Sequence, residues 1–324
     1  MRVFSSLANV LTPTAVALGN FDGIHQGHQQ VICLITNEGH QLGQGVRPTV
    51  VTFHPHPQEF FTGQRRTLLT PLPEKIAQLK QIGIEQLVLL PFDRELASLS
   101  PKQFVEEILV KGLQAKRVSI GMDFCFGQKR AGTADDLCEL AAQHGVDVAI
   151  AQLKRLNGGR ISSSAIREAL QAGNIRHANY LLGRTYSLVG QVVQGQQLGR
   201  TLGFPTANLQ LPPEKFLPQH GVYAVRASIC DRTEELPTTE PTLTGVMNLG
   251  YRPTVDGKRL VAETHFFDWS GDLYGKTLIV YLEDFLRTEQ KFNSVDELKA
   301  QIQLDCEIAQ KLLSAVGSPI SVPG

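Results

Sequence analysis

The stretch VALGNFDGIHQGH, from Val16 to His28, leads from an apolar run into a polar loop that ends with two histidines. The apolar run is typical of a buried strand. If a helix begins near His25, His25 and His28 face the strand end together with the free N–H groups of the first helical turn. Parallel α/β sheets bind their ligands at such strand ends. The stretch therefore predicts an anion site at the edge of an α/β sheet.

The same alternation continues outward from this stretch as far as residue 153. Strand-like runs cover residues 14–19, 49–54, 86–92, 117–122 and 146–153, and helical patterns cover residues 28–43, 73–83, 100–114 and 133–145. Strands that alternate with helices predict a doubly wound parallel sheet, which is an α/β fold of the Rossmann-like type.

The pattern changes after Gly183, where strand-like runs follow one another closely. They cover residues 186–195, 221–230, 243–250, 259–267 and 276–286. A final helix is expected over 294–316, with Leu298, Ile302, Cys306, Ala309 and Leu313 on one apolar face. This texture predicts a small β-barrel with a closing helix. We expect a helical bridge over residues 167–184 and two domains, residues 1–183 and 184–324.

Composition limits the possible partners. The chain has 324 residues and a formal net charge of zero, so no long-range field attracts nucleic acid or an anionic membrane. Its five cysteines are scattered and form no CxxC pair, which argues against disulfides and thiolate metal sites. No signal peptide and no apolar run long enough to span a membrane is found in the sequence. We expect a cytoplasmic protein, and the sequence does not indicate its oligomeric state.

The glycines of the opening loop favour a phosphorylated ligand. Gly19, Gly23 and Gly27 allow such a ligand to approach the backbone closely. The loop contains no lysine, and neither a Walker A motif nor GxGxxG is present, so histidines are expected to contact the phosphates. Imidazoles can donate to phosphate oxygens and offset the charge of a departing pyrophosphate. A zinc site, or ordinary surface histidines at a helix start, are the alternatives.

A second cluster, GGRISSSAIREAL, supports the phosphate interpretation. Serine hydroxyls at a helix start, followed by an arginine one turn later, suit the β- and γ-phosphates of a nucleotide. The alternative is a simple helix N-cap.

The C-terminal half contains its own candidate site. In GRTLGFPTANL, Thr206 and Asn208 present two neutral oxygens on one side of a strand, which suits Mg²⁺ already bound to nucleotide phosphates. Glu263 shares a strand face with His265, and a carboxylate at the mouth of a barrel is a candidate general base. The alternative, for the Thr206–Asn208 pair and for Glu263 alike, is that they are ordinary polar residues on surface strands. GDLYGKT at residues 271–277 has one residue too few between its glycines for a Walker A motif.

Taken together, these motifs resemble a known family. GNFDGIHQGH, FHPHP, GMDFCFGQKRAG and ISSSAIR occur in the order seen in the adenylyltransferase module of the bacterial bifunctional riboflavin kinase/FAD synthetases. GRTLGFPTANL, GVYAV, GVMNLGYRPTV, ETHFFD, GDLYG and FLRTEQKF are similar to the riboflavin kinase module over residues 184–310. The family's serine-serine-threonine is Ser162-Ser163-Ser164 here.

The resemblance implies three sets of site residues. Those implied to bind ATP for adenylylation are Gly19, Asn20, Phe21, Asp22, His25, Gly27, His28, Arg160, Ser162, Ser163, Ser164 and Arg167. Those implied to bind FMN are His56, Asp123, Phe124, Phe126 and Arg130. Those implied to bind ATP or flavin in the kinase are Gly199, Arg200, Gly203, Phe204, Pro205, Thr206, Asn208, Arg252 and Arg287.

The resemblance also implies two reactions that use ATP. A six-stranded C-terminal barrel would phosphorylate riboflavin to FMN, with Mg²⁺ at Thr206 and Asn208 and with Glu263 as the base. The N-terminal sheet would adenylylate FMN to FAD and release pyrophosphate, with His28 as a catalytic residue. Two alternatives stay open: an HxGH nucleotidyltransferase for another phosphate substrate, and a flavin- or nucleotide-binding regulatory protein without turnover.

Overall fold

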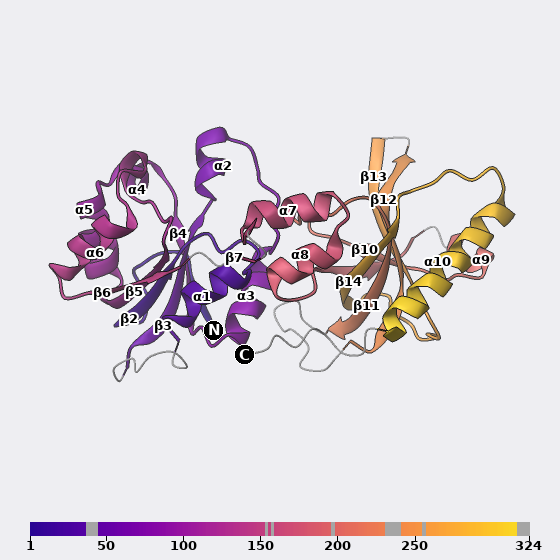
Figure 1. Ribbon diagram of the computed structural model, residues 1–324, viewed down its shortest axis with the longest axis horizontal. Helices are drawn as coiled ribbons and strands as arrows, with labels where there is room; N and C mark the ends of the chain where they lie inside the picture. The colour runs from indigo at the N-terminus through magenta and orange to yellow at the C-terminus, as the bar shows by residue number, and fades with distance from the viewer. Residues whose placement is uncertain are drawn as a thin grey trace. The chain divides into compact units, whose positions relative to one another are not determined.

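The computed structural model describes residues 1–36, 45–152, 155–156, 159–195, 198–230, 241–254 and 257–315 (Figure 1). The chain divides into two compact units, Met1–Ser162 and Ser163–Gly324.

The first unit is built on a parallel six-stranded sheet. Its strands lie in the order β1 (Arg2–Phe4), β4 (Gln86–Pro91), β3 (Arg47–His54), β2 (Thr14–Leu18), β5 (Ala115–Gly121) and β6 (Asp147–Ala151). From β2 the chain adds β3 and β4 on one side and then returns to add β5 and β6 on the other. The carboxyl end of β2 is therefore at the point where the strand order reverses, which is where ligands bind in such sheets. The predicted parallel sheet is confirmed, and β1 is an additional strand.

Helices cover both faces of this sheet (Figure 1). One face packs against α1 (Gln26–Cys33) and α3 (Leu72–Gln81). The other packs against the π-helix η1 (Phe104–Gly112), which continues the short α5 (Pro101–Gln103), and against α6 (Ala134–Ala142). Alternate residues of β2 serve the two faces: Val16 and Leu18 belong to one apolar cluster, and Ala15 and Ala17 to the other. The helix predicted over 28–43 ends at Cys33, and residues 37–44 lie outside the described part.

Several short elements of this unit are not apparent from the sequence pattern. They are α2 (Pro57–Thr62), α4 (Arg94–Ser98), η2 (Gln128–Arg130) and the hairpin of β7 (Arg155–Leu156) and β8 (Gly159–Arg160). Each is too short to show the periodicity that identifies a longer helix or strand.

The second unit is a closed antiparallel barrel, as predicted. Its strands follow the order β10 (Ala207–Gln210), β13 (Gly257–Phe266), β12 (Leu243–Thr254), β11 (Gly221–Cys230), β14 (Thr277–Arg287) and β9 (Ser187–Val193). Tyr223, Met247, Leu249 and Leu278 are fully buried in it. The short helix α9 (Leu198–Leu202) precedes β10.

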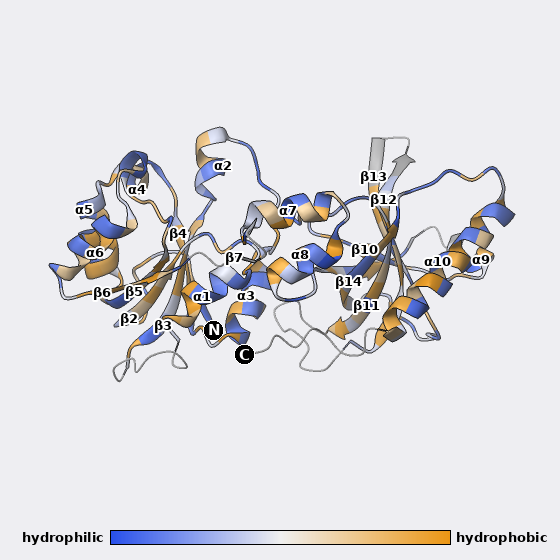
Figure 2. Cartoon of the chain, in the orientation of Figure 1, coloured by the Kyte–Doolittle hydropathy of each residue, from blue (hydrophilic) through white to orange (hydrophobic). Residues whose placement is uncertain are grey.

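The predicted closing helix is α10 (Val295–Ala315), which packs on the outside of the barrel. Cys306, Ala309 and Leu313 form an apolar cluster with Val222 and Val246. Figure 2 shows strand β11 mainly in the hydrophobic colour, whereas α10 carries both colours, as expected for an amphipathic helix.

The predicted bridge forms two helices, α7 (Ser163–Gln171) and α8 (Ile175–Leu182). Helix α8 packs on β14 of the barrel, and α7 packs against α8. The amide of Asn179 donates to the Leu282 carbonyl (2.9 Å) and accepts from the Tyr186 N–H (2.7 Å). The Gln219 N–H donates to the Leu170 carbonyl (2.8 Å). The two compact units therefore divide before α7, twenty-one residues earlier than the predicted boundary at 183/184, which stays a prediction.

Candidate active sites

The loop between β2 and α1 turns sharply at the edge of the sheet. The Gly19 N–H still donates to the Val51 carbonyl of β3 (3.2 Å), which continues the sheet by one residue. Phe21 and Ile24 then adopt positive φ values of 48° and 39°. A Cβ on Gly19 would stand 3.2 Å from the Phe21 ring, so this position requires a small residue. The chain is thereby turned so that α1 begins directly at the strand end.

The two histidines are stacked at the start of α1. His25 is the N-cap, and its Nδ1 accepts a hydrogen bond from the His28 N–H (3.2 Å). The two rings lie 3.6 Å apart between centroids with an interplanar angle of 17°. Because Nδ1 of His25 accepts, its neutral ring carries the proton on Nε2, which becomes a donor. The predicted pair at the N-terminus of a helix is thus present, with imidazole and backbone donors together.

Two other residues of this motif support the loop from within the protein. Phe21 is 1% exposed and meets the His28 ring edge-on at 5.3 Å between centroids. Asp22 is buried, and its Oδ1 accepts from the Thr70 N–H (3.2 Å). Their side chains therefore hold the loop in place, and their implied role in binding ATP stays a prediction.

A lysine reaches this loop from a distant helix, although the loop itself has none. The Lys75 ammonium of α3 donates to the Asn20 carbonyl (2.9 Å), which also accepts from the Thr52 hydroxyl (3.1 Å). Burial lowers the pKa of Lys75, while the nearby Asp22 carboxylate opposes that shift. Lys75 is not among the residues predicted from the sequence. The sequence does indicate that Lys75 lies on the apolar face of a helix, because it stands between Leu72 and Leu79 at helical spacing.

The residues implied to bind FMN occupy loops at the carboxyl ends of β3 and β5. His56 is the N-cap of α2, and its Nδ1 accepts from the Gln58 N–H (3.1 Å). Burial is the main cause that lowers the pKa of His56, with the Arg66 guanidinium adding to it. Asp123 pairs with Arg160, so the structure brings together an implied FMN residue and an implied ATP residue.

The implied aromatic residues after β5 differ in their surroundings. Phe124 is half-buried, and its ring is stacked on that of Phe126 with 5.9 Å between centroids. Phe126 is 5% exposed and packs in the core against Phe104, at 5.4 Å between centroids. The Phe126 ring therefore supports the loop from below, and its implied role in binding FMN stays a prediction. Arg130 is exposed, with a positive φ of 59°.

A cluster of four phenylalanines lies at the same edge of the sheet and was not predicted. Phe92 follows β4 and meets Phe53, Phe60 and Phe61 edge-on, at 5.7, 5.4 and 5.8 Å between centroids. Phe61 is 71% exposed, which is unusual for so large an apolar side chain. The cluster offers an aromatic surface beside His56. In the sequence, Phe53 and Phe92 lie in predicted strands as if they were ordinary core residues, and Phe60 and Phe61 lie outside the predicted elements.

The serine cluster begins α7 and thus belongs to the second unit, except for Ser162. Ser163 and Ser164 are the first two residues of α7. The Arg167 guanidinium lies over the Phe216 ring, 4.5 Å from its centroid. This contact aligns the arginine on an aromatic face.

The predicted kinase residues converge on one face of the barrel. Asn208 of β10 and Glu263 of β13 are directly opposite each other, and Asn248 of β12 is opposite Glu263 on its other side. Side chains at such paired positions point to the same face of a sheet.

That face is the outer one, which corrects the expectation that Glu263 points into the barrel mouth. Thr264 and Phe266 are buried, whereas Glu263 and His265 are half-buried, so their predicted alternation is confirmed. His265 is paired with Val246, which packs under α10 outside the barrel. Among the described residues, the large side chains of Tyr223, Met247 and Leu249 are fully buried in the barrel.

Glycines and a proline shape the surroundings of Asn208 and Thr206. A Cβ on Gly195 would overlap the Asn208 amide, and one on Gly199 would stand 3.3 Å from the Thr206 hydroxyl. The His265 Nδ1 lies 2.9 Å from the Pro205 carbonyl. Among the remaining implied kinase residues, Phe204 meets the His265 ring edge-on at 5.4 Å, Arg200 is exposed, and Gly203 has a φ of 90°.

Arg287 is held by a structural ion pair. Its guanidinium donates to both oxygens of Asp305 on α10, at 2.8 to 3.1 Å, and both side chains are largely buried. The ion pair thus joins β14 to the closing helix, and the implied role of Arg287 in binding ATP or flavin stays a prediction. Arg252 lies on β12, and its side chain is outside the described part.

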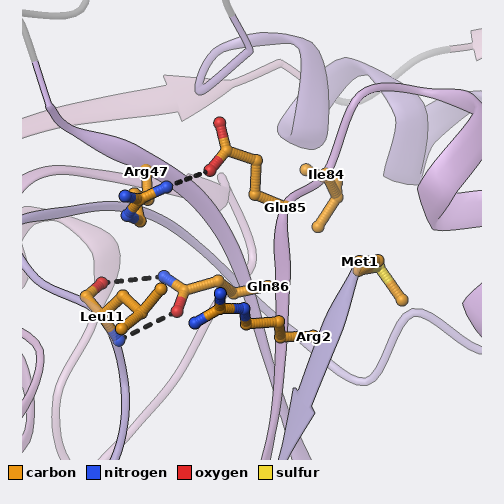
Figure 3. A pocket seen from close by; sticks show the side chains of 7 residues that line it. All are labelled: Met1, Arg2, Leu11, Arg47, Ile84, Glu85 and Gln86. Atoms are coloured by element: carbon orange, nitrogen blue, oxygen red, sulfur yellow. Dashed lines mark hydrogen bonds and ion pairs between the residues drawn. The ribbon is translucent and has the colours of Figure 1, made fainter.

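Other features of the described residues give no further site. A shallow hollow is lined by Met1, Arg2, Leu11, Arg47, Ile84, Glu85 and Gln86 (Figure 3). It lies at the amino ends of β1, β3 and β4, opposite the edge at which such sheets bind ligands. Among the described residues, no three His, Cys, Asp or Glu side chains are grouped to hold a metal ion. No described helix is long and apolar enough to cross a membrane.

Comparisons with known proteins match two separate parts of the chain to two enzyme families. Residues 8–165 match the FAD synthetase family and residues 182–313 match the riboflavin kinase family. The chain is 40% identical over 291 residues to the bifunctional riboflavin kinase/FMN adenylyltransferase of Escherichia coli K12, covering 90% of both chains. It is 38% identical over 310 residues to the enzyme of that name in Bacillus subtilis 168, covering 93% of both.

A crystal structure of a protein named macrolide-efflux protein, from Streptococcus pneumoniae, has the same fold. Its TM-score is 0.83 at 32% identity, and the match covers 95% of this chain and 98% of that one. The motifs, the two folds and the relatives agree over nearly the whole length of the protein. The chain belongs to the bifunctional riboflavin kinase/FMN adenylyltransferase family.

Proposed function

We propose that this protein makes FMN from riboflavin and ATP on its barrel, and FAD from FMN and ATP at the edge of its parallel sheet. The observation that carries the kinase assignment is the pairing of Asn208 with Glu263. The one that carries the adenylyltransferase assignment is the stacked pair of His25 and His28 at the start of α1. Each pair sits within the half that matches the corresponding family.

In the adenylyltransferase reaction, a phosphate oxygen of FMN attacks the α-phosphorus of ATP. The bond from the α-phosphorus to its bridging oxygen breaks, and pyrophosphate leaves with the negative charge. His28, His25 and the first N–H groups of α1 are suited to donate to these phosphate oxygens as the charge develops. Arg160, Ser162, Ser163, Ser164 and Arg167 are proposed to bind the same nucleotide, on the strength of their motif.

The flavin of FMN is proposed to lie against aromatic and polar groups that end β3 and β5. The exposed Phe61 and its neighbours Phe60 and Phe92 offer ring edges and faces of the kind that pack against an isoalloxazine. His56, Asp123, Phe124 and Arg130 are proposed to complete this surface. Phe126 supports the loop that carries Phe124.

In the kinase reaction, the terminal hydroxyl of the ribityl chain attacks the γ-phosphorus of ATP, and ADP leaves. Glu263 is proposed to take the hydroxyl proton, because a hydroxyl is a poor nucleophile until its proton is accepted. Asn208 and Asn248 on either side would orient the carboxylate or the nucleophile.

The residues near Asn208 fit a magnesium ion that arrives with ATP. Thr206 and Asn208 supply neutral oxygens, which suit a hard cation already bound to phosphates. Gly195 and Gly199 leave open the space that a Cβ would fill beside these two side chains. When bound, Mg²⁺ would neutralise phosphate charge, while Thr206 and Asn208 hold the nucleotide in place.

One experiment tests the proposal against its alternatives. The purified protein is incubated with riboflavin, ATP and Mg²⁺, and the flavins are separated by chromatography while pyrophosphate is measured. We expect FMN first and then FAD with one pyrophosphate per FAD. FMN without FAD would favour another phosphate substrate for the sheet half. Tight binding with no product would favour a regulatory protein.

A further inference from the structure

The buried lysine of α3 is the group in the first unit whose position the motifs do not explain. Lys75 is 8% exposed, and its ammonium donates to the Asn20 carbonyl at 2.9 Å. The same carbonyl accepts from the Thr52 hydroxyl at 3.1 Å. Thr52 is on β3, so one carbonyl is held by residues from two separate elements. That carbonyl belongs to the first residues of the loop that ends at His25.

The charges around Lys75 are arranged to keep it in place. The Asp22 carboxylate, which belongs to the same loop, attracts the Lys75 ammonium. Asp22 is itself oriented by the Thr70 N–H, which donates to its Oδ1. His56 of α2 lies near both, and the Arg66 guanidinium lies near His56. On its own helix, Lys75 follows the buried Glu74. The ammonium is therefore enclosed by groups from the loop, α2 and α3.

Such a lysine costs stability where an apolar residue would not. A buried cation loses its hydration, and partners recover that loss only when the geometry is good. The apolar face of α3 would pack at lower cost with leucine or methionine at this position. The cost is explained if the ammonium does something that an apolar side chain cannot do.

We propose that Lys75 is a positioning residue of the adenylyltransferase site, acting through the Asn20 carbonyl to fix the loop that presents His25 and His28. This inference rests on the proposed role of the two histidines. The loop contains residues with positive φ, namely Phe21 and Ile24, which persist only where the surroundings hold them. The bond from Lys75, together with the one from Thr52, supplies that hold at the start of the loop. A lysine thus serves a loop that lacks one, without being the group that contacts the transferred phosphate.

The test compares Lys75→Met with Lys80→Met, which removes an exposed lysine of the same helix. Both reactions are measured by steady-state kinetics on the full chain, so that riboflavin phosphorylation reports the state of the rest of the protein. We expect Lys75→Met to lower kcat for FMN adenylylation about 100-fold, the scale of a small misplacement of catalytic groups. We expect ATP KM to change less than kcat, phosphorylation to be unchanged, and Lys80→Met to match the parent.

Two further variants keep the inference falsifiable. Lys75→Gln retains a donor and should recover part of the lost kcat, whereas equal losses in the Gln and Met variants would contradict an action through the hydrogen bond. If Lys75→Met fails to melt cooperatively, Thr52→Val carries the test, because it removes the other bond to the Asn20 carbonyl and keeps a branched side chain of similar shape. If a folded Lys75→Met variant adenylylates FMN at the rate of the unsubstituted protein, the inference is wrong. Where Lys75→Met does not fold, the same result in Thr52→Val would contradict it. If the unsubstituted protein makes no FAD, the proposed adenylyltransferase function itself is wrong.

Discussion

Asn208 and Glu263 stand directly opposite each other on β10 and β13, although 55 residues separate them in the sequence. Asn248 flanks Glu263 from β12, so the carboxylate lies between two amides on the outer face of the barrel. Closure of the barrel creates this row, because it pairs β10 with β13, which comes three strands later in the chain. The proposed metal ligand and the proposed base are thereby adjacent.

Replacing Glu263 by Gln should separate the two activities. The amide keeps the shape of the side chain but cannot accept the hydroxyl proton. We expect riboflavin phosphorylation to fall by about two to four orders of magnitude, the usual scale for a lost general base. FMN adenylylation, measured as pyrophosphate release, should persist. Parental phosphorylation by this variant would rule out Glu263 as the base.

His28→Ala should have the converse effect. It removes an imidazole that we propose donates to the phosphates, at a cost of about 3 kcal/mol in transition-state stabilisation. FMN should accumulate from riboflavin with little FAD. Far-ultraviolet circular dichroism serves as the control, because the His28 ring also stacks on His25 and meets Phe21. If a folded variant forms FAD at the parental rate, the histidine pair has a structural role only.

The sequence predicts most of the architecture because its signals are periodic. Alternation of strands with amphipathic helices predicted the parallel sheet, and closely spaced strands predicted the barrel. Period-two alternation also predicted that Glu263 and His265 share a face, but it could not say that this face is the outer one. That assignment depends on which side α10 covers, through Val246 and its neighbours.

The parts of the sites that could not be predicted depend on long-range packing. Lys75 meets the Asn20 carbonyl across 55 residues, and nothing local to either residue indicates the contact. The sequence places Phe126 in a loop that resembles a binding loop. It does not indicate that the Phe126 backbone pairs with Gly132 or that the ring is buried in the core. The ion pair between Arg287 and the buried Asp305 of α10 could likewise not be predicted from the sequence near either residue.

His56 should make the first unit less stable in mild acid. Its pKa is lowered from 6.5 in the folded protein, mainly by burial, so the unfolded chain binds the proton first. As the pH falls below 6.5, unfolding is favoured progressively until the lowered folded pKa is passed. Protonation would also remove the Nδ1 acceptor that caps α2. His56→Asn keeps a capping oxygen without this titration.

We therefore expect the free energy of unfolding of the parent to fall more than that of His56→Asn between pH 7.5 and 5. Denaturant unfolding at several pH values, followed by circular dichroism, measures the difference. Equal pH dependence in the two proteins would show that His56 does not contribute.

The two halves should be separable, and the best place to cut follows from α8. The Asn179 amide bonds both the Leu282 carbonyl and the Tyr186 N–H, and Leu181 and Leu182 are buried. A chain that begins at Ser163 keeps these interactions, whereas one that begins at Arg184 loses them. We expect the longer chain to be more stable by about 2 kcal/mol or more, the scale of a buried leucine or of two lost hydrogen bonds.

Both truncated chains contain Thr206, Asn208 and Glu263 and should convert riboflavin to FMN, with the shorter one failing at a lower temperature. Thermal melting and chromatography of the flavins measure the two properties. Equal melting temperatures would show that α7 and α8 do not stabilise the barrel. If the chain from Ser163 folds cooperatively but makes no FMN, the kinase site requires residues of the first unit, and the proposed division of the two activities is wrong. If it makes FMN at the parental rate, every residue that kinase chemistry needs lies after Ser162.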